Sequence, residues 1–353
     1  MFIGNSNFDF FQRGEFMLFS VGYQLRVDDS LIDAVLKNKN KIREIYFSWE
    51  DFPNGRNTLS NSDFSIYEAR EKRDEDFKRL FDEGIAFNLL LNGNCYGKDA
   101  QSRSFFCKVG DTADYLIEKY GLSSVTTTSP LIAKFFKQNF PQIEVRASVN
   151  MEIGTAEGMD YIAEYFDGFY LKREYNRNFE KITVAKVWCR KNFKKLYGLA
   201  NSGCLNFCSA HIFHDNLVSH ENEIAQMDNA YQFEGICWDY LKGSESRENW
   251  LKITNFIRPE DTKLYEGLFD GIKLATRVNA NPARIINAYC KGTYSGAVTE
   301  LLEPNHSGIF YPKVIENKKI PETFGEKVLK CNKNCDECGF CHQVQETATV
   351  VLE

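Results

Sequence analysis

Residues 195–220 read KLYGLANSGCLNFCSAHIFHDNLVSH. The segment opens with a short apolar run at 196–200 that is typical of a buried β-strand, and the strand pattern ends at Asn201-Ser202-Gly203. Thiols and imidazoles that directly follow a strand indicate a site for a soft metal ion or an iron–sulfur cluster. Two cysteines and three of the protein's five histidines lie here within seventeen residues: Cys204, Cys208, His211, His214 and His220.

Short β-rich runs alternate with amphipathic helical runs over most of the chain. Strict alternation predicts a parallel sheet, and about eight units predict an α/β fold of the (β/α)₈ TIM-like barrel type, with an open doubly wound sheet as the alternative. We therefore expect a barrel over residues 14–302 and a small Cys-rich extension over 303–353. Strands are predicted at 17–23, 43–49, 86–92, 123–129, 144–150, 168–174 and 196–200, with an eighth at 254–257 or 271–274; helices are predicted at 30–36, 70–83, 111–120, 130–140, 155–165 and 179–191.

Polar residues follow most of these predicted strands. In a (β/α)₈ barrel the functional residues gather where the strands end, so these residues are candidates for an active-site rim. The alternative is that any strand end which meets water carries polar residues. The set comprises Tyr23, Gln24, Trp49, Glu50, Asn92, Asn94, Asn150, Glu152, Lys172, Arg173 and Glu174, and Cys204 follows the seventh strand.

Composition limits the classes of protein to which the chain can belong. The formal charge of −6 over 353 residues argues against a nucleic-acid-binding surface, which needs a basic face. The chain opens without the basic and apolar regions of a secretory signal, and no apolar run approaches the ~18 residues of a membrane span. A reducing, cytoplasmic location is therefore expected, where clustered cysteines bind metal more often than they form disulfides.

The cysteines after the seventh predicted strand are the first candidate ligands. Cys204-x3-Cys208 can bind one metal centre, and Cys237 is the nearest later thiol and the expected third ligand. The fourth ligand is left open between Cys95, a cysteine of the tail, and none. The alternative is a set of buried, inert thiols. His211 and His214 can bind metal, transfer protons, or only form hydrogen bonds in a loop.

A second group of cysteines lies near the end of the chain. Cys331-x3-Cys335-x2-Cys338-x2-Cys341 places four thiols within eleven residues, interleaved with polar residues that cannot form a hydrophobic core. The pattern predicts a structural Cys₄ zinc site or a second [4Fe–4S] cluster, and its dense spacing is closer to that of ferredoxin-like runs.

Three cations surround the last predicted strand. Arg258, Lys273 and Arg277 can hold the carboxylate or phosphate of an anionic small molecule, or form ordinary salt bridges. The sequence has no G-x-G-x-x-G, P-loop or G-x-S-x-G motif, which argues against the common dinucleotide, nucleotide triphosphate and serine hydrolase sites.

Three segments together resemble the peptidase U32 family and its U32-like relatives: NSGCLNFCSAH at 201–211, FIRPEDTKLYEGLFDGIKLATR at 256–277 and NAYCKGTYSGAVTELL at 287–302. The resemblance extends over about residues 17–302. It implies an iron–sulfur protein with a barrel core, related to the paired proteins of oxygen-independent ubiquinone hydroxylation and to enzymes that hydroxylate tRNA or ribosomal RNA, for which prephenate is the implicated oxygen donor. By this resemblance Cys204, Cys208 and Cys237 correspond to cluster ligands, and Lys273 and Arg277 match a characteristic segment of the family.

The residues and the resemblance together predict an oxygen-independent oxidoreductase of the hydroxylase type with a [4Fe–4S] cluster at the barrel mouth. His211 or His214 would transfer protons, and Arg258, Lys273 and Arg277 would hold an anionic, prephenate-like donor. Two alternatives stay open: a metal-dependent peptidase or hydrolase, and a non-catalytic cluster-bearing subunit that needs a homologous partner subunit.

Overall fold

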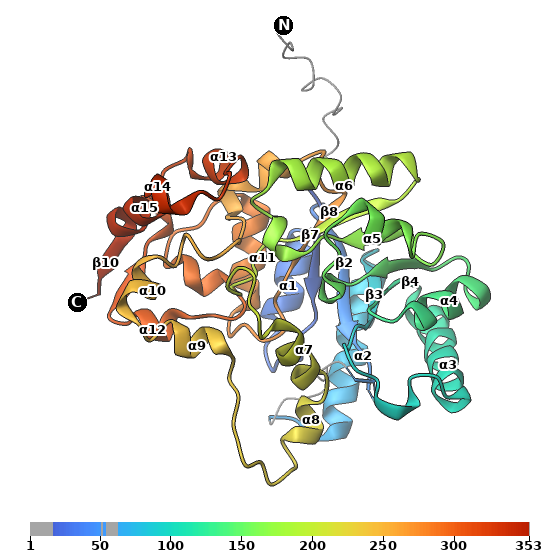
Figure 1. Cartoon of the computed structure of the whole chain (residues 1–353). Helices are drawn as coiled ribbons and strands as arrows, with labels where there is room; N and C mark the ends of the chain where they lie inside the picture. The colour runs from blue at the N-terminus through green and yellow to red at the C-terminus, as the bar shows by residue number, and fades with distance from the viewer. Residues whose placement is uncertain (1–16, 51, 54–62, 353) are drawn as a thin grey trace, which may run out of the picture.

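Eight parallel strands form a closed barrel in the computed structural model, which describes residues 17–50, 52–53 and 63–352 (Figure 1). Each strand pairs with the next in sequence, and β1 pairs with β8 to close the barrel. The predicted (β/α)₈ barrel is thus confirmed, the open sheet is excluded, and of the two candidates for the eighth strand the second is correct. The strands are β1 Phe19–Gly22, β2 Ile42–Ser48, β3 Ala86–Leu91, β4 Leu122–Thr127, β5 Glu144–Ala147, β6 Gly168–Tyr170, β7 Lys195–Leu199 and β8 Gly271–Leu274.

Helices cover the outside of the barrel and match most of the predicted ranges. The prediction for α3 was wrong at its start: the helix begins at Arg103, because Ser102 caps it by accepting a hydrogen bond from the Phe105 N–H, and it ends as expected at Gly121, whose φ is 62°. The helix predicted at 155–165 is also shorter than expected and ends at Asp160. The covering helices are α1 Ser30–Lys37, α2 Ile66–Asp82, α3 Arg103–Tyr120, α4 Pro130–Asn139, α5 Ala156–Asp160, α6 Phe179–Lys191 and α11 Pro282–Lys291.

A long excursion connects β7 to β8. It contains α7 His211–Ser219, α8 Glu221–Ile224, α9 Ile236–Tyr240, α10 Ser244–Glu248 and the 3₁₀-helix Pro259–Tyr265. The backbone N–H of Asn94, in the loop after β3, donates to Ser219 Oγ over 2.8 Å. α7 therefore lies at the end of the barrel where the strands finish (Figure 1).

The interior of the barrel is polar at its centre. Glu44 of β2 and Arg146 of β5 form a buried ion pair, and the hydroxyl of Ser20 donates to Glu44 over 2.7 Å. On the other face of β2, Phe47 packs edge-on against Phe77 of α2, with ring centroids 4.8 Å apart. Because side chains alternate along a strand, β2 turns polar residues into the barrel and apolar residues outward. The apolar core therefore lies between the barrel and the helices.

The C-terminal residues pack against the excursion between β7 and β8. The Gln345 side chain, buried on α15, accepts a hydrogen bond from the Leu251 N–H over 2.8 Å, and Phe324 and Val344 belong to the main hydrophobic core. In Figure 1 this region is the orange-to-red part on the side away from α3 and α4. It comprises α12 Ser307–Phe310, β9 Lys313–Ile315, α13 Phe324–Leu329, α14 Cys335–Cys338, α15 Phe340–Ala348 and β10 Thr349–Val351, in which β9 and β10 are antiparallel.

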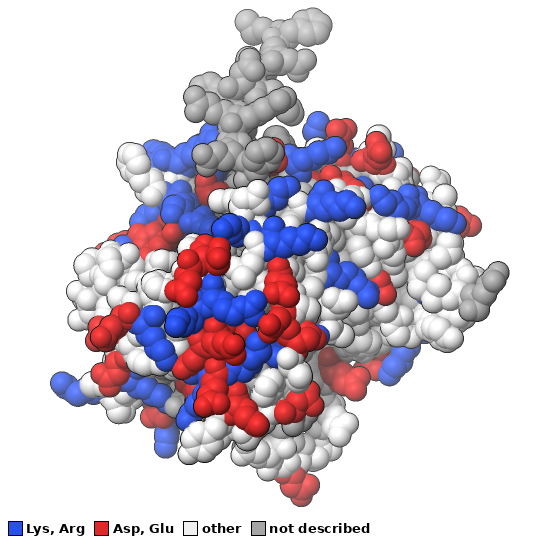
Figure 2. All heavy atoms as spheres, turned by 180° about the vertical axis from the view of Figure 1, so that it is seen from behind, with Lys and Arg blue, Asp and Glu red and all other residues white. Residues whose placement is uncertain are grey.

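Within the described residues, no helix has both the length and the apolar character needed to cross a membrane. Figure 2 shows Lys and Arg interspersed with Asp and Glu over the face that it presents. That face therefore has a mixed-charge character.

Candidate functional site

The loop that carries Cys204 is fixed by its neighbours at the end of β7. Asn201 accepts a hydrogen bond from the Ala275 N–H over 2.6 Å and donates to the Leu301 carbonyl over 2.8 Å, which ties the loop to the end of β8. A Cβ added at Gly203 would lie 2.2 Å from the Pro304 carbonyl oxygen, so only glycine allows this backbone approach. Cys204 is therefore held in place at the barrel mouth.

Three thiols come together at this mouth. Cys204 and Cys208 are half-buried and Cys237, on α9, is buried. Burial raises the pKa of the Cys237 thiol to about 11, and the negative charges of Cys204 and then Cys208 contribute to the rise. Cys237 is thus within electrostatic reach of both Cys204 and Cys208.

The spacing of these thiols bears on the kind of metal centre that they can hold. Among the described residues, the three sulfur atoms do not all lie within 4.8 Å of one another. A single tetrahedral zinc, with Zn–S bonds of about 2.3 Å, would need closer sulfurs. The three sulfur atoms therefore do not form a ready-made site for a single zinc ion.

Arg173, which follows β6, contacts both the thiols and a group of carboxylates. Its Nη1 donates to Cys204 Sγ over 3.5 Å, while Nη2 lies 3.6 Å from Glu152 and 3.9 Å from Asp215. Burial alone would lower the pKa of Arg173. The negative charges of its neighbours, Cys204 first, outweigh burial and raise the pKa. The guanidinium therefore links a sulfur ligand to the acidic side of the site.

The two histidines predicted to act here differ in their surroundings. His211 Nδ1 lies 3.3 Å from Glu152 and its Nε2 3.4 Å from Asp215, and burial, followed by the charge of Arg173, lowers its pKa to about 3. His211 is therefore neutral at pH 7. A Cβ on Gly235 would lie 3.4 Å from both His214 Cε1 and Cys237 Sγ, so His214 is the imidazole placed beside the sulfur group.

His211 also belongs to a set of oxygen and nitrogen donors. One ligand atom each from Glu152, Glu174 and His211 lies within 4.8 Å of the others. Lys172 Nζ, however, lies 3.7 Å from Glu152 and 3.9 Å from Glu174. The cations of Lys172 and Arg173 already neutralise these carboxylates, which disfavours a metal ion here.

Of the three predicted anion-binding cations, the structure brings two together. Lys273 points into the barrel with Nζ 4.0 Å from the centroid of the Tyr46 ring, and the Arg277 guanidinium lies 5.8 Å from the same centroid. Arg258 is separate from them. It is buried, binds both carboxylate oxygens of Asp261 at 2.7 and 2.9 Å, and donates to backbone carbonyls, contacts that fit a structural salt bridge better than the expected anion-binding role.

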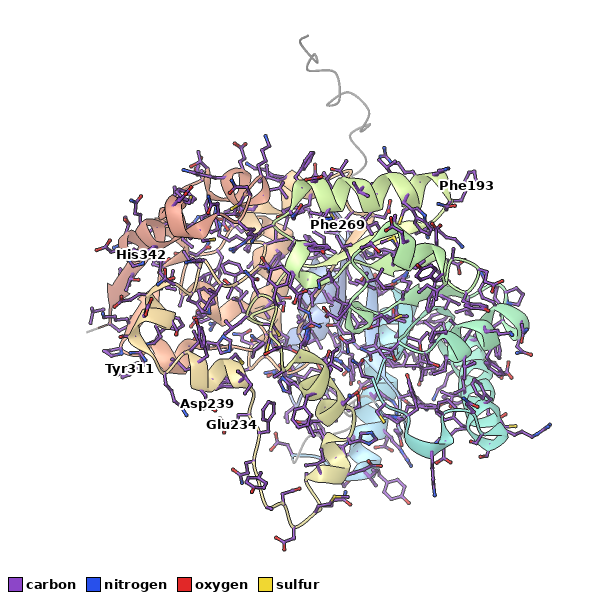
Figure 3. All side chains as sticks on the ribbon, in the orientation of Figure 1. Phe193, Glu234, Asp239, Phe269, Tyr311 and His342 are labelled. Atoms are coloured by element: carbon purple, nitrogen blue, oxygen red, sulfur yellow. The ribbon has the colours of Figure 1, made fainter. Side chains whose placement is uncertain are left out.

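The four tail cysteines line one cavity of about 310 Å³, together with His342. The Lys333 N–H donates to Cys331 Sγ over 3.2 Å. Burial raises the pKa of the Cys341 thiol, the charge of Arg177 opposes the rise, and Cys331 and Cys335 add to it. His342 lies on α15 at the outer side of the C-terminal region, and its Nδ1 is 3.2 Å from the Glu248 carbonyl oxygen (Figure 3). Cys331, Cys335, Cys338 and Cys341 therefore share the lining of one cavity, and metal binding there stays a prediction.

Several residues of the site were not singled out from the sequence. Glu152 and Arg173 were expected only as members of a polar rim, and Asp215 was not expected at all. The contact between Cys95 and His220 was also missed, because the two residues are far apart in the sequence and no local spacing joins them. The alternation of Glu44, Tyr46 and Ser48 in β2 was a usable signal for the polar interior.

Fold and site together define a (β/α)₈-barrel protein with two groups of cysteines, one at the barrel mouth and one in the C-terminal region. No protein-family model matches the chain. The chain is 29% identical over 330 residues to the uncharacterized protease MJ1657 of Methanocaldococcus jannaschii, covering 89% of this chain and 91% of the relative. The solved structure of the U32 peptidase Mk0906 matches with a TM-score of 0.53 and 15% identity, over 75% of this chain and 94% of that one. The chain thus shares its barrel fold with a U32 peptidase, in agreement with the predicted resemblance.

Proposed function

We propose that this U32-like protein is an oxygen-independent oxidoreductase of the hydroxylase type that holds a [4Fe–4S] cluster on Cys204, Cys208 and Cys237. The proposal depends chiefly on one observation, the gathering of these three thiols where the barrel strands end. That end of a (β/α)₈ barrel is where catalytic residues lie in enzymes with this fold.

The electrostatics of the thiols support a cationic centre between them. Burial, followed by the negative charges of Cys204 and Cys208, raises the pKa of the Cys237 thiol, so ionised Cys204 and Cys208 repel a thiolate at Cys237. A bound iron centre removes that repulsion, since thiolates are its natural ligands and metal binding releases their protons. When bound, such a cluster supplies one-electron transfer and, where an iron lacks a protein ligand, a binding position for substrate.

The protein's own groups have separate tasks around this centre. Arg173 donates a hydrogen bond to the Cys204 sulfur and is itself held by Glu152 and Asp215. Hydrogen bonds to cluster sulfurs tune the reduction potential. His214 lies beside Cys237 and is the histidine that we assign to proton transfer, whereas His211, whose pKa is about 3, stays neutral between Glu152 and Asp215.

Lys273 and Arg277 are the groups that would hold an anionic substrate or donor of the prephenate type. Both lie against the Tyr46 ring: Lys273 of β8 from inside the barrel, and Arg277 from the loop after β8. Two cations beside an aromatic ring can bind a carboxylate by charge and by bidentate hydrogen bonds from arginine. Arg258 is left out of this assignment because Asp261 already binds it.

The tail cysteines would hold a second [4Fe–4S] cluster or a zinc ion. The shared cavity and the Lys333 N–H on Cys331 Sγ support a thiolate site of this kind. A cluster there would pass electrons toward the barrel, and a zinc ion would act as a structural clip.

A metal-dependent peptidase or hydrolase is the second candidate function. The names of the two relatives favour it, as does the donor set of Glu152, Glu174 and His211. Lys172 and Arg173 beside those carboxylates argue against it. Peptide cleavage by the metal-loaded protein, abolished by a chelator, would support this alternative. Co-purification with a homologous subunit would instead support a non-catalytic, cluster-bearing role.

Metal analysis of protein purified and reconstituted without oxygen tests the main proposal. We expect iron and acid-labile sulfide in equal amounts and an EPR signal on reduction. Protein that takes up only zinc, with neither sulfide nor a signal, would exclude the redox function.

A further inference from the structure

Cys95 and His220 come from distant parts of the chain and meet at the barrel mouth. Cys95 lies in the loop after β3, and His220 lies at the end of α7. The residues just before them are joined, because the Asn94 N–H donates to Ser219 Oγ over 2.8 Å. This hydrogen bond holds the loop of Cys95 against the end of α7, where His220 follows.

Three side chains follow one another here from sulfur to carboxylate. The His220 imidazole lies within reach of the Cys95 thiol, and its Nδ1 lies 2.6 Å from Glu223 Oε2 on α8. The backbone N–H of Gly97 donates to Cys95 Sγ over 3.4 Å. A nucleophile, a base in contact with it, and an acid that orients the base form the arrangement of an activated nucleophile.

The charges in this group favour a thiolate beside an imidazolium. The hydrogen bond from His220, followed by that from Gly97, lowers the pKa of Cys95, while the charge of Glu223 acts weakly in the opposite direction. Contact with Cys95 and then with Glu223 raises the pKa of His220. Low-pKa cysteines next to a histidine are the reactive ones, whereas burial raises the pKa of Cys189 and Cys290 to about 12 and leaves them inert.

The group is accessible and lies apart from the sulfur ligands of the barrel. Cys95 is half-buried, and the side chains of His220 and Glu223 are 28% and 70% exposed. His211, at the first residue of α7, contacts Glu152, whereas Ser219, at the last residue, contacts the Cys95 loop. The two sites therefore lie at opposite ends of one helix, and a reagent can reach this one from solvent.

We propose that Cys95, His220 and Glu223 form a second, nucleophilic site that accepts acyl groups from activated esters or thioesters. The Cys95 thiolate attacks the carbonyl carbon, a carbon–sulfur bond forms, and the bond to the leaving group breaks as the His220 imidazolium gives that group its proton. Neutral His220 then takes a proton from a water molecule, which attacks the acyl-cysteine; the carboxylic acid leaves and the thiolate returns. Glu223 orients His220 throughout.

An activated ester suits this site better than a peptide. The backbone donor at this site, the Gly97 N–H, contacts the sulfur of Cys95. Attack on an activated ester needs less stabilisation of the developing oxyanion than attack on a peptide, because the ester has a better leaving group than an amine. This inference uses none of the three cysteines proposed to hold the cluster, and it assigns Cys95 to the nucleophilic site in place of the open fourth ligand position.

The test is acetylation of the full-length protein by p-nitrophenyl acetate at pH 7, followed by peptide mass spectrometry. Cys107, exposed on α3, is the internal control. We expect Cys95 to be acetylated about tenfold faster than Cys107, since its thiolate fraction is larger although each thiolate is somewhat less nucleophilic. H220Q should reduce the Cys95 rate to that of Cys107, and E223Q should reduce it in part.

Matched variants keep this experiment decisive. E221Q changes an exposed glutamate on the same short helix and should leave the rate unchanged. The triple variant C204A/C208A/C237A should also acetylate at the normal rate, which separates this site from the proposed cluster. Circular dichroism confirms that each variant is folded. Equal rates at Cys95 and Cys107 in the wild-type protein, or an unchanged rate in folded H220Q, would overturn the proposal.

Discussion

Arg173 Nη1 lies 3.5 Å from Cys204 Sγ and donates a hydrogen bond to it. The two residues follow neighbouring strands, β6 and β7, so the barrel itself sets their separation. The same guanidinium reaches Glu152 and Asp215. A single buried arginine thus connects the thiols of the mouth with its carboxylates.

Replacing this arginine should weaken metal binding without removing a ligand. R173K keeps the positive charge but loses the planar fork that reaches sulfur and carboxylates together. Loss of such an outer contact typically lowers metal affinity about tenfold to a hundredfold. We expect reduced iron occupancy after anaerobic reconstitution at limiting iron. R190K, on the exposed end of α6, is the control, and equal occupancy in the two variants would argue against a role for the Arg173 contact.

Arg258 should prove to be a structural residue. R258A leaves the buried carboxylate of Asp261 without its partner, which typically costs about 3–5 kcal/mol. Urea unfolding should show this loss, and the double variant R258M/D261L should recover much of it. A variant that loses binding of an anionic ligand at unchanged stability would contradict this assignment and restore Arg258 to the binding site.

Stability should fall as the pH drops below the ordinary pKa of histidine. Burial holds the pKa of His211 at about 3 in the folded protein, so between pH 6.5 and 3 the unfolded chain takes up a proton that the folded chain does not. This linkage costs at most about 1.4 kcal/mol per pH unit for one group. Burial lowers the pKa of His306 to about 4 with the same sign, whereas the raised pKa of His220 acts oppositely.

Urea unfolding at pH 7 and pH 5 measures the His211 contribution. H211Q should lose less stability than the wild-type protein between these pH values, and H342Q, at a more exposed histidine, should behave like the wild type. The same pH dependence in H211Q as in the wild type would show that His211 does not carry this linkage.

The tail cysteines should bind metal independently of the barrel. C335A/C341A removes two thiols from the shared cavity and should remove the metal bound there while leaving that of the mouth. Because α15 is joined to Leu251 through Gln345, we also expect faster proteolysis near the C-terminus. C107A is the control; metal content and proteolysis equal to those of C107A would argue against a tail site.

The sequence predicted elements whose determinants are local. The residues of α6 matched their predicted range, because Asn178 caps a helix of regular pattern. The start of α3 was missed, since the Ser102 cap follows a loop and precedes the periodic part of the helix. The tail cysteines could be predicted to share one site because their spacing lies within one short segment, and the structure places them along one cavity.

Contacts between distant strands could not be predicted in this way. Glu44 and Arg146 form their buried pair because closure of the barrel places β2 and β5 around one interior. From the sequence, Arg258 could either bind an anion or form a salt bridge. The structure favours the salt bridge because Arg258 is buried against Asp261, a contact that sequence spacing does not reveal.

Iron and sulfide counting on the triple variant C204A/C208A/C237A tests the central claim most directly. After anaerobic reconstitution, we expect the wild-type protein to hold about four more iron and four more sulfide per chain than this variant, as one [4Fe–4S] cluster requires. The EPR signal of that cluster should be missing from the variant. Equal iron and sulfide in the two proteins would contradict a cluster at the barrel mouth.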